Sequence, residues 1–272
     1  MSADKEIKKV TVPEIIVYKN RGEKIAALTA YDFLMASILD EVGIEIILVG
    51  DSAGMVVAGD ATTLSIGMEE MLYHTRIVSR AVKRALVVAD MPFLSYQISF
   101  EKAVENAGRF LKEGQAEAIK IEGGEPFAEL IRKLTSIGIP VMGHIGLIPQ
   151  SVHKFGGYKL QGKSPDNAQR LKKEAKILEE AGVFSIVLEK IPFSLAKEIT
   201  ESVNVPTIGI GAGPYCDGQI LVTHDLLGIF EKFKPKFVRR YAEVGQIMRK
   251  AFENYKNDVK KGLFPSLDES FE

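Results

Sequence analysis

The stretch IILVGDS (residues 46–52) decides the fold of this chain, because four branched aliphatic residues lead directly into a glycine, an aspartate and a serine. A strand that is buried on both faces has a continuous run of Val, Ile and Leu, and such strands belong to parallel sheets. The run therefore predicts a buried parallel strand that ends on two reactive polar side chains.

Five further runs of the same kind occur along the chain. They are LVVAD (residues 86–90), AIKIE (118–122), IPVMGH (139–144), SIVLE (185–189) and VPTIGIG (205–211). Five of the six runs end on Asp, Ser, Lys, Glu or His, and the sixth ends on glycines. Polar residues at the carboxyl ends of successive parallel strands are typical of an active site at the mouth of a (β/α)₈ barrel.

The segments between these runs have the periodicity of amphipathic helices, so the chain alternates strand and helix. We expect a first strand at residues 24–29 and an eighth at 219–222. The expected helices cover residues 33–42, 68–84, 100–113, 127–137, 166–181 and 194–203, with a closing helix at 241–261. Asp166 and Ser194 are the expected N-caps of their helices.

This alternation predicts an α/β protein with a single (β/α)₈ TIM-barrel domain over residues 1–272, preceded by a short N-terminal segment and closed by a helical tail. The length of 272 residues agrees with one barrel. A GxGxxG motif between a first strand and helix is missing, which disfavours a dinucleotide-binding sheet.

The overall composition indicates a soluble protein of the cytoplasm. The net charge of −1 gives no indication of nucleic acid or of an anionic membrane surface as a partner. The single cysteine cannot form an internal disulfide, which agrees with a reducing compartment. The polar N-terminus lacks the apolar core of a signal peptide, and no apolar run approaches the length of a membrane helix.

Asp51, Asp90 and Glu122 end three successive strands, so their side chains are expected to converge over one mouth of the barrel. Three carboxylates placed together repel one another unless a cation neutralises them. Oxygen ligands suit a hard divalent ion, and Mg²⁺ is the first choice. The alternative is that individual carboxylates cap helices or pair with Lys and Arg.

Lys120 lies two residues before Glu122, so both side chains share one face of a strand. A lysine inside a barrel must be paired, either with these carboxylates or with an anionic substrate. A Schiff-base lysine is a further alternative, but the carboxylates would keep it protonated. Ser52 offers a hydroxyl to a substrate carboxylate, or it simply forms a turn.

Two further strand-end residues have candidate roles. His144 ends the fifth run, where a structural and a catalytic role are both open. Glu189 ends the sixth run, across the mouth from the metal carboxylates, where it could act as a general base or pair with Lys190. The glycines of the seventh run suit a phosphate-binding turn or merely a tight turn.

Seven motifs in this order give the chain a resemblance to the ketopantoate hydroxymethyltransferase family. They are LTAYD (residues 28–32), VGDSAGMVVAG (49–59), ADMPF (89–93), KIEGG (120–124), GHIGLIPQ (143–150), LEKIP (188–192) and GIGAG (209–213). Together they span most of the chain, and we see no departure at the key positions.

The resemblance implies a Mg²⁺-dependent enzyme of pantothenate and coenzyme A biosynthesis. It would transfer a hydroxymethyl group from 5,10-methylenetetrahydrofolate to 3-methyl-2-oxobutanoate through a Mg²⁺-stabilised enolate, giving 2-dehydropantoate. The family's motifs place the metal on Asp51, Asp90 and Glu122, and the proton acceptor at Glu189.

The same motifs assign substrate binding to Asp51, Ser52, Asp90 and Lys120, and leave Tyr31 and His144 as accessory residues of open role. The resemblance also implies a cytoplasmic homo-oligomer, commonly a decamer built as a pentamer of dimers. No nucleic acid or membrane partner is implied.

Two rival functions are weighed beside this one. The first is a Mg²⁺-dependent 2-oxo acid lyase or mutase of the phosphoenolpyruvate mutase and isocitrate lyase type, although a KKCGH-type lyase motif is missing. The second is a barrel that binds a metabolite without catalysis, but such a barrel would have lost Glu189 or a metal carboxylate, and this sequence keeps them all.

Overall fold

The computed structural model describes residues 8–231 and 234–272, and within these ranges eight parallel strands pair in chain order. β8 pairs with β1, which closes the sheet into a barrel and confirms the predicted (β/α)₈ fold. The strands are β1 (Ile25–Thr29), β2 (Ile46–Val49), β3 (Leu86–Asp90), β4 (Ala118–Glu122), β5 (Val141–Gly146), β6 (Ser185–Glu189), β7 (Thr207–Ile210) and β8 (Gly218–Leu221).

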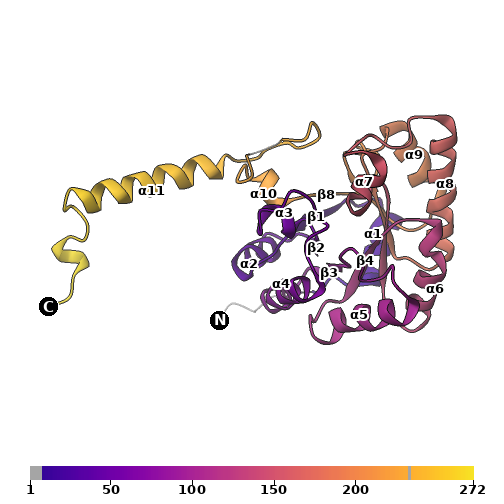
Figure 1. Cartoon of the computed structure of the whole chain (residues 1–272), viewed down its shortest axis with the longest axis horizontal. Coiled ribbons are helices and arrows are strands. Elements are labelled where there is room, and N and C mark those ends of the chain that lie inside the picture. Colours follow the sequence, from indigo (N-terminus) through magenta and orange to yellow (C-terminus); the bar gives the residue numbers. More distant parts are fainter. Residues whose placement is uncertain (1–7, 232–233) are drawn as a thin grey trace. The chain divides into compact units, whose positions relative to one another are not determined.

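Helices follow the strands and lie around them, as Figure 1 shows. They are α2 (Phe33–Glu41), α3 (Ala53–Val56), α4 (Met68–Ala81), α5 (Phe100–Lys112), α6 (Ala128–Ser136), α7 (Val152–Phe155), α8 (Pro165–Glu180) and α9 (Phe193–Ser202). Short 3₁₀ turns, η1 (Glu125–Phe127) and η2 (Pro149–Ser151), precede α6 and α7. The segments 52–67 and 145–165, which follow β2 and β5 and for which the sequence predicted no helix, therefore contain short helices.

The strands alternate between two apolar layers, and this alternation sets the direction of the site residues. Leu86 and Val88 of β3 belong to the cluster that fills the barrel, whereas Val87 and Ala89 pack outward with the helices. The next inward position on β3 is Asp90, because side chains alternate with a period of two. On β4, Ala118 belongs to the interior cluster, so the same alternation directs Lys120 and Glu122 into the barrel.

A helix that the sequence analysis did not predict closes the N-terminal end of the barrel. α1 (Val12–Arg21) has Pro13 in its first turn, a position at which proline favours helix formation. Its Ile15 is fully buried in the same cluster as Ile25 and Ile208 of the barrel interior. The sequence analysis gave this region only as a short polar N-terminal segment, yet α1 closes the end of the barrel opposite the strand-end carboxylates.

Two expected helix caps are wrong by a few residues. Ser164 caps α8 by accepting a hydrogen bond from Asn167 N, while Asp166 lies in the first turn. Pro165 occupies the first helical position, so the cap must precede it. α9 begins at Phe193, so Ser194 lies inside the helix.

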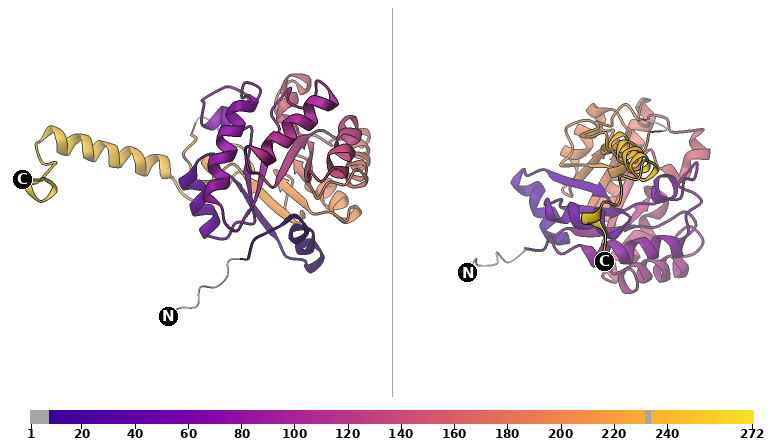
Figure 2. Two further views of the ribbon diagram at one scale, coloured as in Figure 1. Left: turned by 90° about the horizontal axis from the view of Figure 1, so that it is seen from below. Right: turned by 90° about the vertical axis from the view of Figure 1, so that its left-hand side faces the viewer.

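The chain divides into two compact units, Met1–Leu221 and Val222–Glu272. The second unit contains α10 (Thr223–Leu226), α11 (Val244–Lys260) and a 3₁₀ turn, η3 (Leu267–Glu269). α11 corresponds to the closing helix predicted at residues 241–261 and is drawn in yellow-orange in Figure 2. Among the described residues, no helix combines the length and the apolar character that a bilayer crossing requires.

We predict that Gly146→Ala destabilises the barrel at the end of β5. Gly146 has φ of +99°, and a Cβ there would collide with the backbone oxygen of Glu189 on β6. Gly138 has a similar φ of +90° but open space around it, so Gly138→Ala isolates the cost of the backbone conformation. We expect the control to cost about 1–2 kcal/mol and Gly146→Ala to cost about 2 kcal/mol more, measured by urea unfolding. Equal losses would contradict the collision.

Candidate active site

Three buried carboxylates meet at the carboxyl end of the barrel. Asp51 lies two residues beyond β2, while Asp90 and Glu122 are the last residues of β3 and β4. Each offers an oxygen within 4.8 Å of the others, and each is at least 96% buried. The structure thus brings together the three residues that the sequence predicted as metal ligands.

Lys120 provides a positive charge at the centre of this group. Its Nζ lies 2.7 Å from Asp90 Oδ1 and 3.6 Å from Glu122 Oε1, and all three side chains are almost fully buried. Burial alone would lower the pKa of Lys120, but Asp90, Glu122 and Asp51 outweigh it and raise that pKa above its ordinary value. Lys120 is therefore a permanent cation, which rules out a neutral Schiff-base nucleophile in this state.

One lysine does not balance three carboxylates. Burial, with the charges of Asp90 and Glu122, raises the pKa of Asp51 well above its ordinary value. Burial also raises the pKa of Asp90, although Lys120 opposes it. Burial acts in the same direction on Glu122, but Lys120 and His144 outweigh it and lower the pKa of Glu122. Excess negative charge of this kind is what a divalent cation neutralises, so the donor set fits a hard metal ion.

His144 connects the carboxylate group to Glu189. Its Nδ1 lies 3.6 Å from Glu122 Oε1, and its Nε2 lies 3.3 Å from Glu189 Oε2. Burial and the charge of Lys120 lower the pKa of His144, but Glu122 and Glu189 outweigh them and raise that pKa to about 9. Lys120 Nζ lies 3.3 Å from the same Nδ1, so the imidazole stands between one ammonium and two carboxylates.

Glu189 is the most accessible member of this constellation. Its side chain is 14% exposed, against 2% to 4% for Asp90, Lys120, Glu122 and His144. The sequence analysis placed Glu189 across the mouth from the metal carboxylates, and the structure adds that His144 lies between it and Glu122. We call Asp51, Asp90, Lys120, Glu122, His144 and Glu189 the mouth cluster.

Tyr31 and Ser52 form a hydroxyl pair beside Asp51. The Tyr31 hydroxyl and Ser52 Oγ are 2.8 Å apart, and the backbone oxygen of Tyr31 lies 2.7 Å from His74 Nδ1. Gly50 makes this arrangement feasible, because a Cβ at that position would lie only 2.8 Å from Ser52 Oγ. The two residues therefore extend the polar group beyond β2.

The segments after β2 and β5 meet over the mouth. The Tyr158 hydroxyl, from the segment after α7, lies 3.9 Å from Met55 Sδ of α3, and Lys190 Nζ donates a hydrogen bond to the Tyr158 backbone oxygen. Burial and the charges of Asp51 and Glu189 raise the pKa of Tyr158. The Tyr158 hydroxyl and Met55 therefore join the segment after β5 to the segment after β2.

Sequence reasoning missed two buried residues of this site, Tyr96 and Gln150. The Tyr96 hydroxyl donates to the backbone oxygen of Glu122 at 3.0 Å, and Gln150 contacts two of the three carboxylates. Gln150 ends the GHIGLIPQ motif, and a glutamine in a Gly- and Pro-containing segment directly after a site strand was the available signal.

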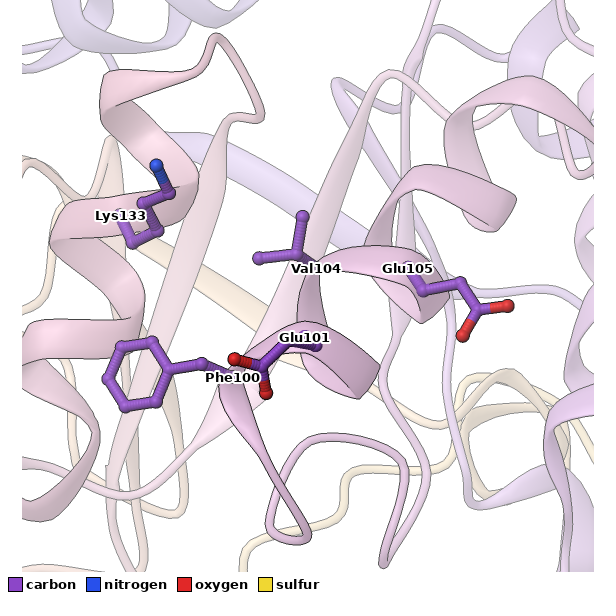
Figure 3. Close-up of a pocket in the computed structure, with 5 residues that line it drawn as sticks. All are labelled: Phe100, Glu101, Val104, Glu105 and Lys133. Atoms are coloured by element: carbon purple, nitrogen blue, oxygen red, sulfur yellow. The ribbon is translucent and has the colours of Figure 1, made fainter.

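A hollow on the outside of the barrel is separate from this site. Figure 3 shows Phe100, Glu101, Val104 and Glu105 of α5 beside Lys133 of α6. These residues come from the helical layer and not from the carboxyl ends of strands. No residue of the mouth cluster therefore lines this hollow.

Comparison with known proteins identifies the family of this chain. The family model described as ketopantoate hydroxymethyltransferase matches residues 9–267. A protein of Syntrophus aciditrophicus named 3-methyl-2-oxobutanoate hydroxymethyltransferase is 56% identical over 271 residues, covering 100% of both chains. A protein of the same name from Clostridium kluyveri is 56% identical over 263 residues, covering 97% of this chain and 94% of the other.

Solved structures with a similar fold are much more distant in sequence. A phosphonopyruvate hydrolase has a TM-score of 0.63 at 13% identity, covering 97% of this chain and 92% of the other. A 2,3-dimethylmalate lyase, described as a member of the PEP mutase/isocitrate lyase superfamily, has a TM-score of 0.61 at 17% identity, with 96% and 91% covered. These likenesses concern the fold, which matches that of the rival lyase and mutase class.

Proposed function

The chain belongs to the ketopantoate hydroxymethyltransferase family, and we propose that the mouth cluster is where it performs the hydroxymethyl transfer. The substrate is 3-methyl-2-oxobutanoate, the one-carbon donor is 5,10-methylenetetrahydrofolate, and the product is 2-dehydropantoate of pantothenate and coenzyme A biosynthesis. The observation that carries the proposal is the set of three buried carboxylates within 4.8 Å of one another, with a lysine among them and a more accessible glutamate nearby.

Asp51, Asp90 and Glu122 are the proposed holders of a Mg²⁺ ion. All three are oxygen donors, and the raised pKa of Asp51 indicates a site that lacks positive charge. When bound there, Mg²⁺ supplies Lewis acidity that withdraws electrons from the keto group of a 2-oxo acid and so acidifies the C3–H bond.

Lys120 and Ser52 are the proposed partners of the substrate's anionic end. Lys120 is a buried permanent cation, so it attracts a carboxylate without a change in its own protonation. The Ser52 hydroxyl already pairs with Tyr31, which orients it beside Asp51. Asp51 and Asp90 complete the substrate contacts that the family motifs assign.

Glu189 is the proposed base that removes the C3 proton of the ketoacid. Its carboxylate is partly exposed at the end of β6, and His144 Nε2 lies 3.3 Å from one of its oxygens. Water cleaves the methylene bridge of the folate, so tetrahydrofolate leaves and the one-carbon unit is released as formaldehyde. The C3 carbanion adds to the formaldehyde carbon, and the resulting alkoxide takes the proton that Glu189 had removed. The segments carrying Met55 and Tyr158 would limit access of bulk water to the carbanion.

Product formation from the two substrates tests this function directly. We expect 2-dehydropantoate to form with Mg²⁺ and to fall by about 100-fold or more after chelation with EDTA, because Lewis-acid assistance contributes several kcal/mol. Phosphonopyruvate and 2,3-dimethylmalate serve as comparison substrates. Turnover of either one, without formation of 2-dehydropantoate, would favour the lyase or mutase alternative.

A homo-oligomer, with a decamer as the form that the family resemblance implies, is part of the proposal. Met248, Phe252, Tyr255 and Val259 follow a 4-3-4 spacing along α11, and each is at least 40% exposed. This spacing places them on one face of the helix. An exposed apolar stripe of this kind suits contact with a second copy of the chain.

We predict that Phe252→Asp combined with Val259→Asp lowers the molar mass of the assembly. Each substitution would place a charge in the stripe of α11, where a protein interface excludes water. Asn257→Asp adds the same charge on the opposite face of the helix and should leave the mass unchanged. Light scattering after size-exclusion chromatography measures the mass, and a double variant with wild-type mass would contradict this interface.

The proposed location is the cytoplasm. Cys216 is the one cysteine of the chain, and its thiol is free and buried. A free thiol agrees with a reducing compartment.

A further inference from the structure

Gln150 contacts two of the three carboxylates at once. It lies in η2, after β5, and is 6% exposed. Its backbone N–H donates to Glu122 Oε2 at 2.9 Å, and its side-chain Nε2 donates to Asp51 Oδ2 at 3.0 Å. A single residue therefore links a carboxylate of β4 with the one that follows β2.

The orientation of the Gln150 amide is fixed by four hydrogen bonds. Nε2 also donates to the backbone oxygen of Met91 at 2.9 Å, so both of its hydrogens are used. Oε1 accepts from Gln97 Nε2 at 3.3 Å, and it lies 2.9 Å from the Tyr96 hydroxyl, whose single hydrogen it shares with the backbone oxygen of Glu122. If the amide were flipped, the oxygen Oε1 would face two further acceptors, Asp51 Oδ2 and the Met91 backbone oxygen. The network therefore permits only the orientation in which Nε2 donates to Asp51.

These contacts leave Asp51 Oδ1 for another partner, whereas Glu122 Oε1 faces Lys120 Nζ and His144 Nδ1, each 3.6 Å away. Asp51 Oδ1 and Glu122 Oε1 take no hydrogen bond from Gln150, and the donated bonds hold the two carboxylates against their mutual repulsion. Partners of this kind behind metal ligands typically change metal affinity by about 10- to 100-fold when they are removed.

We propose that Gln150 is a positioning residue that holds Asp51 and Glu122 at the spacing a divalent cation needs. The inference rests on the proposed metal site and goes beyond it by assigning the group that arranges the ligands. Gln150 itself contributes no ligand atom, because its Nε2 hydrogens face the carboxylate and the Met91 carbonyl.

The test measures Mn²⁺ binding to the full-length metal-free protein by electron paramagnetic resonance, without substrates. Gln150→Met keeps the length of the side chain and removes the amide, so we expect affinity to fall by about 10- to 100-fold. Gln150→Leu removes the same amide without adding a charge and tests the same contact if the Met variant fails to fold. Either variant binding Mn²⁺ within twofold of wild type would overturn the proposal.

Asn106→Leu is the matched control. Asn106 is also a buried amide, but its Nδ2 donates to the backbone oxygen of Ser95 at 2.7 Å and not to a carboxylate. We expect Asn106→Leu to lower the melting temperature and to leave Mn²⁺ affinity unchanged. If Asn106→Leu lost as much Mn²⁺ affinity as Gln150→Met, the role of Gln150 would be a general structural one, and the proposal would be overturned. If the wild-type protein bound no Mn²⁺, the proposed metal site itself would be refuted. If the wild type bound Mn²⁺ and the Gln150 variants bound it equally well, only the inference about Gln150 would fail.

Discussion

Glu189→Gln should reduce hydrogen–deuterium exchange at C3 of 3-methyl-2-oxobutanoate by about 100- to 10,000-fold, the usual contribution of a positioned base. Glutamine keeps the size of the side chain and can still contact His144, which lies 3.3 Å from the Glu189 carboxylate. It cannot accept the substrate proton at neutral pH. Binding of the ketoacid and of the metal should therefore change much less than proton transfer.

Proton NMR in D₂O measures this exchange, because deuteration at C3 collapses the methyl doublet of the substrate. Spectra are compared with Mg²⁺ and with EDTA, in the presence of folate donor. Glu45→Gln is the matched control, since Glu45 precedes β2 at the opposite end of the barrel and pairs with Arg84. Exchange in Glu189→Gln at the wild-type rate would exclude Glu189 as the base, and no exchange in the wild type would contradict enolate formation altogether.

Successive side chains of a strand point to opposite faces of the sheet, and this alternation made most of the site predictable from sequence. Lys120 and Glu122 lie two residues apart, and the structure places both charges within 3.6 Å on the inner face of β4. Asp90 and Glu189 are the final residues of their strands, as the runs LVVAD and SIVLE predicted. Local alternation and strand length contain this information, so no knowledge of distant contacts was needed.

Contacts between distant segments explain what sequence analysis missed. Gln150 meets Asp51 across 99 residues of chain, and nothing in the local pattern around Gln150 specifies that contact. α1 was missed for a similar reason, because the role of Ile15 becomes visible only when the barrel interior that it closes is present. The cap of α8 was misplaced by two residues, since Pro165 and Asp166 both suit the start of a helix.

Lys120→Met should destabilise the metal-free protein by about 3–5 kcal/mol, the cost of breaking a buried ion pair by removing one partner. Asp90 and Glu122 would lose the cation at 2.7 Å and 3.6 Å while remaining buried. Lys102→Met is the control, because Lys102 pairs with Glu105 at 3.0 Å with both side chains about half exposed. The control should cost less than about 1 kcal/mol, as measured by urea unfolding.

The same variant separates binding of the substrate from binding of the metal. Removal of the Lys120 charge leaves the oxygens of Asp51, Asp90 and Glu122 in place, so Mn²⁺ should bind at least as tightly as in the wild type. Because the ion binds the folded state, it should also restore part of the lost free energy of unfolding. The ketoacid loses its cationic partner, so its KM should rise by about 10-fold or more. A variant that loses Mn²⁺ binding and keeps the wild-type KM would reverse the two roles, because Lys120 would then support the metal site and leave the substrate anion to Ser52.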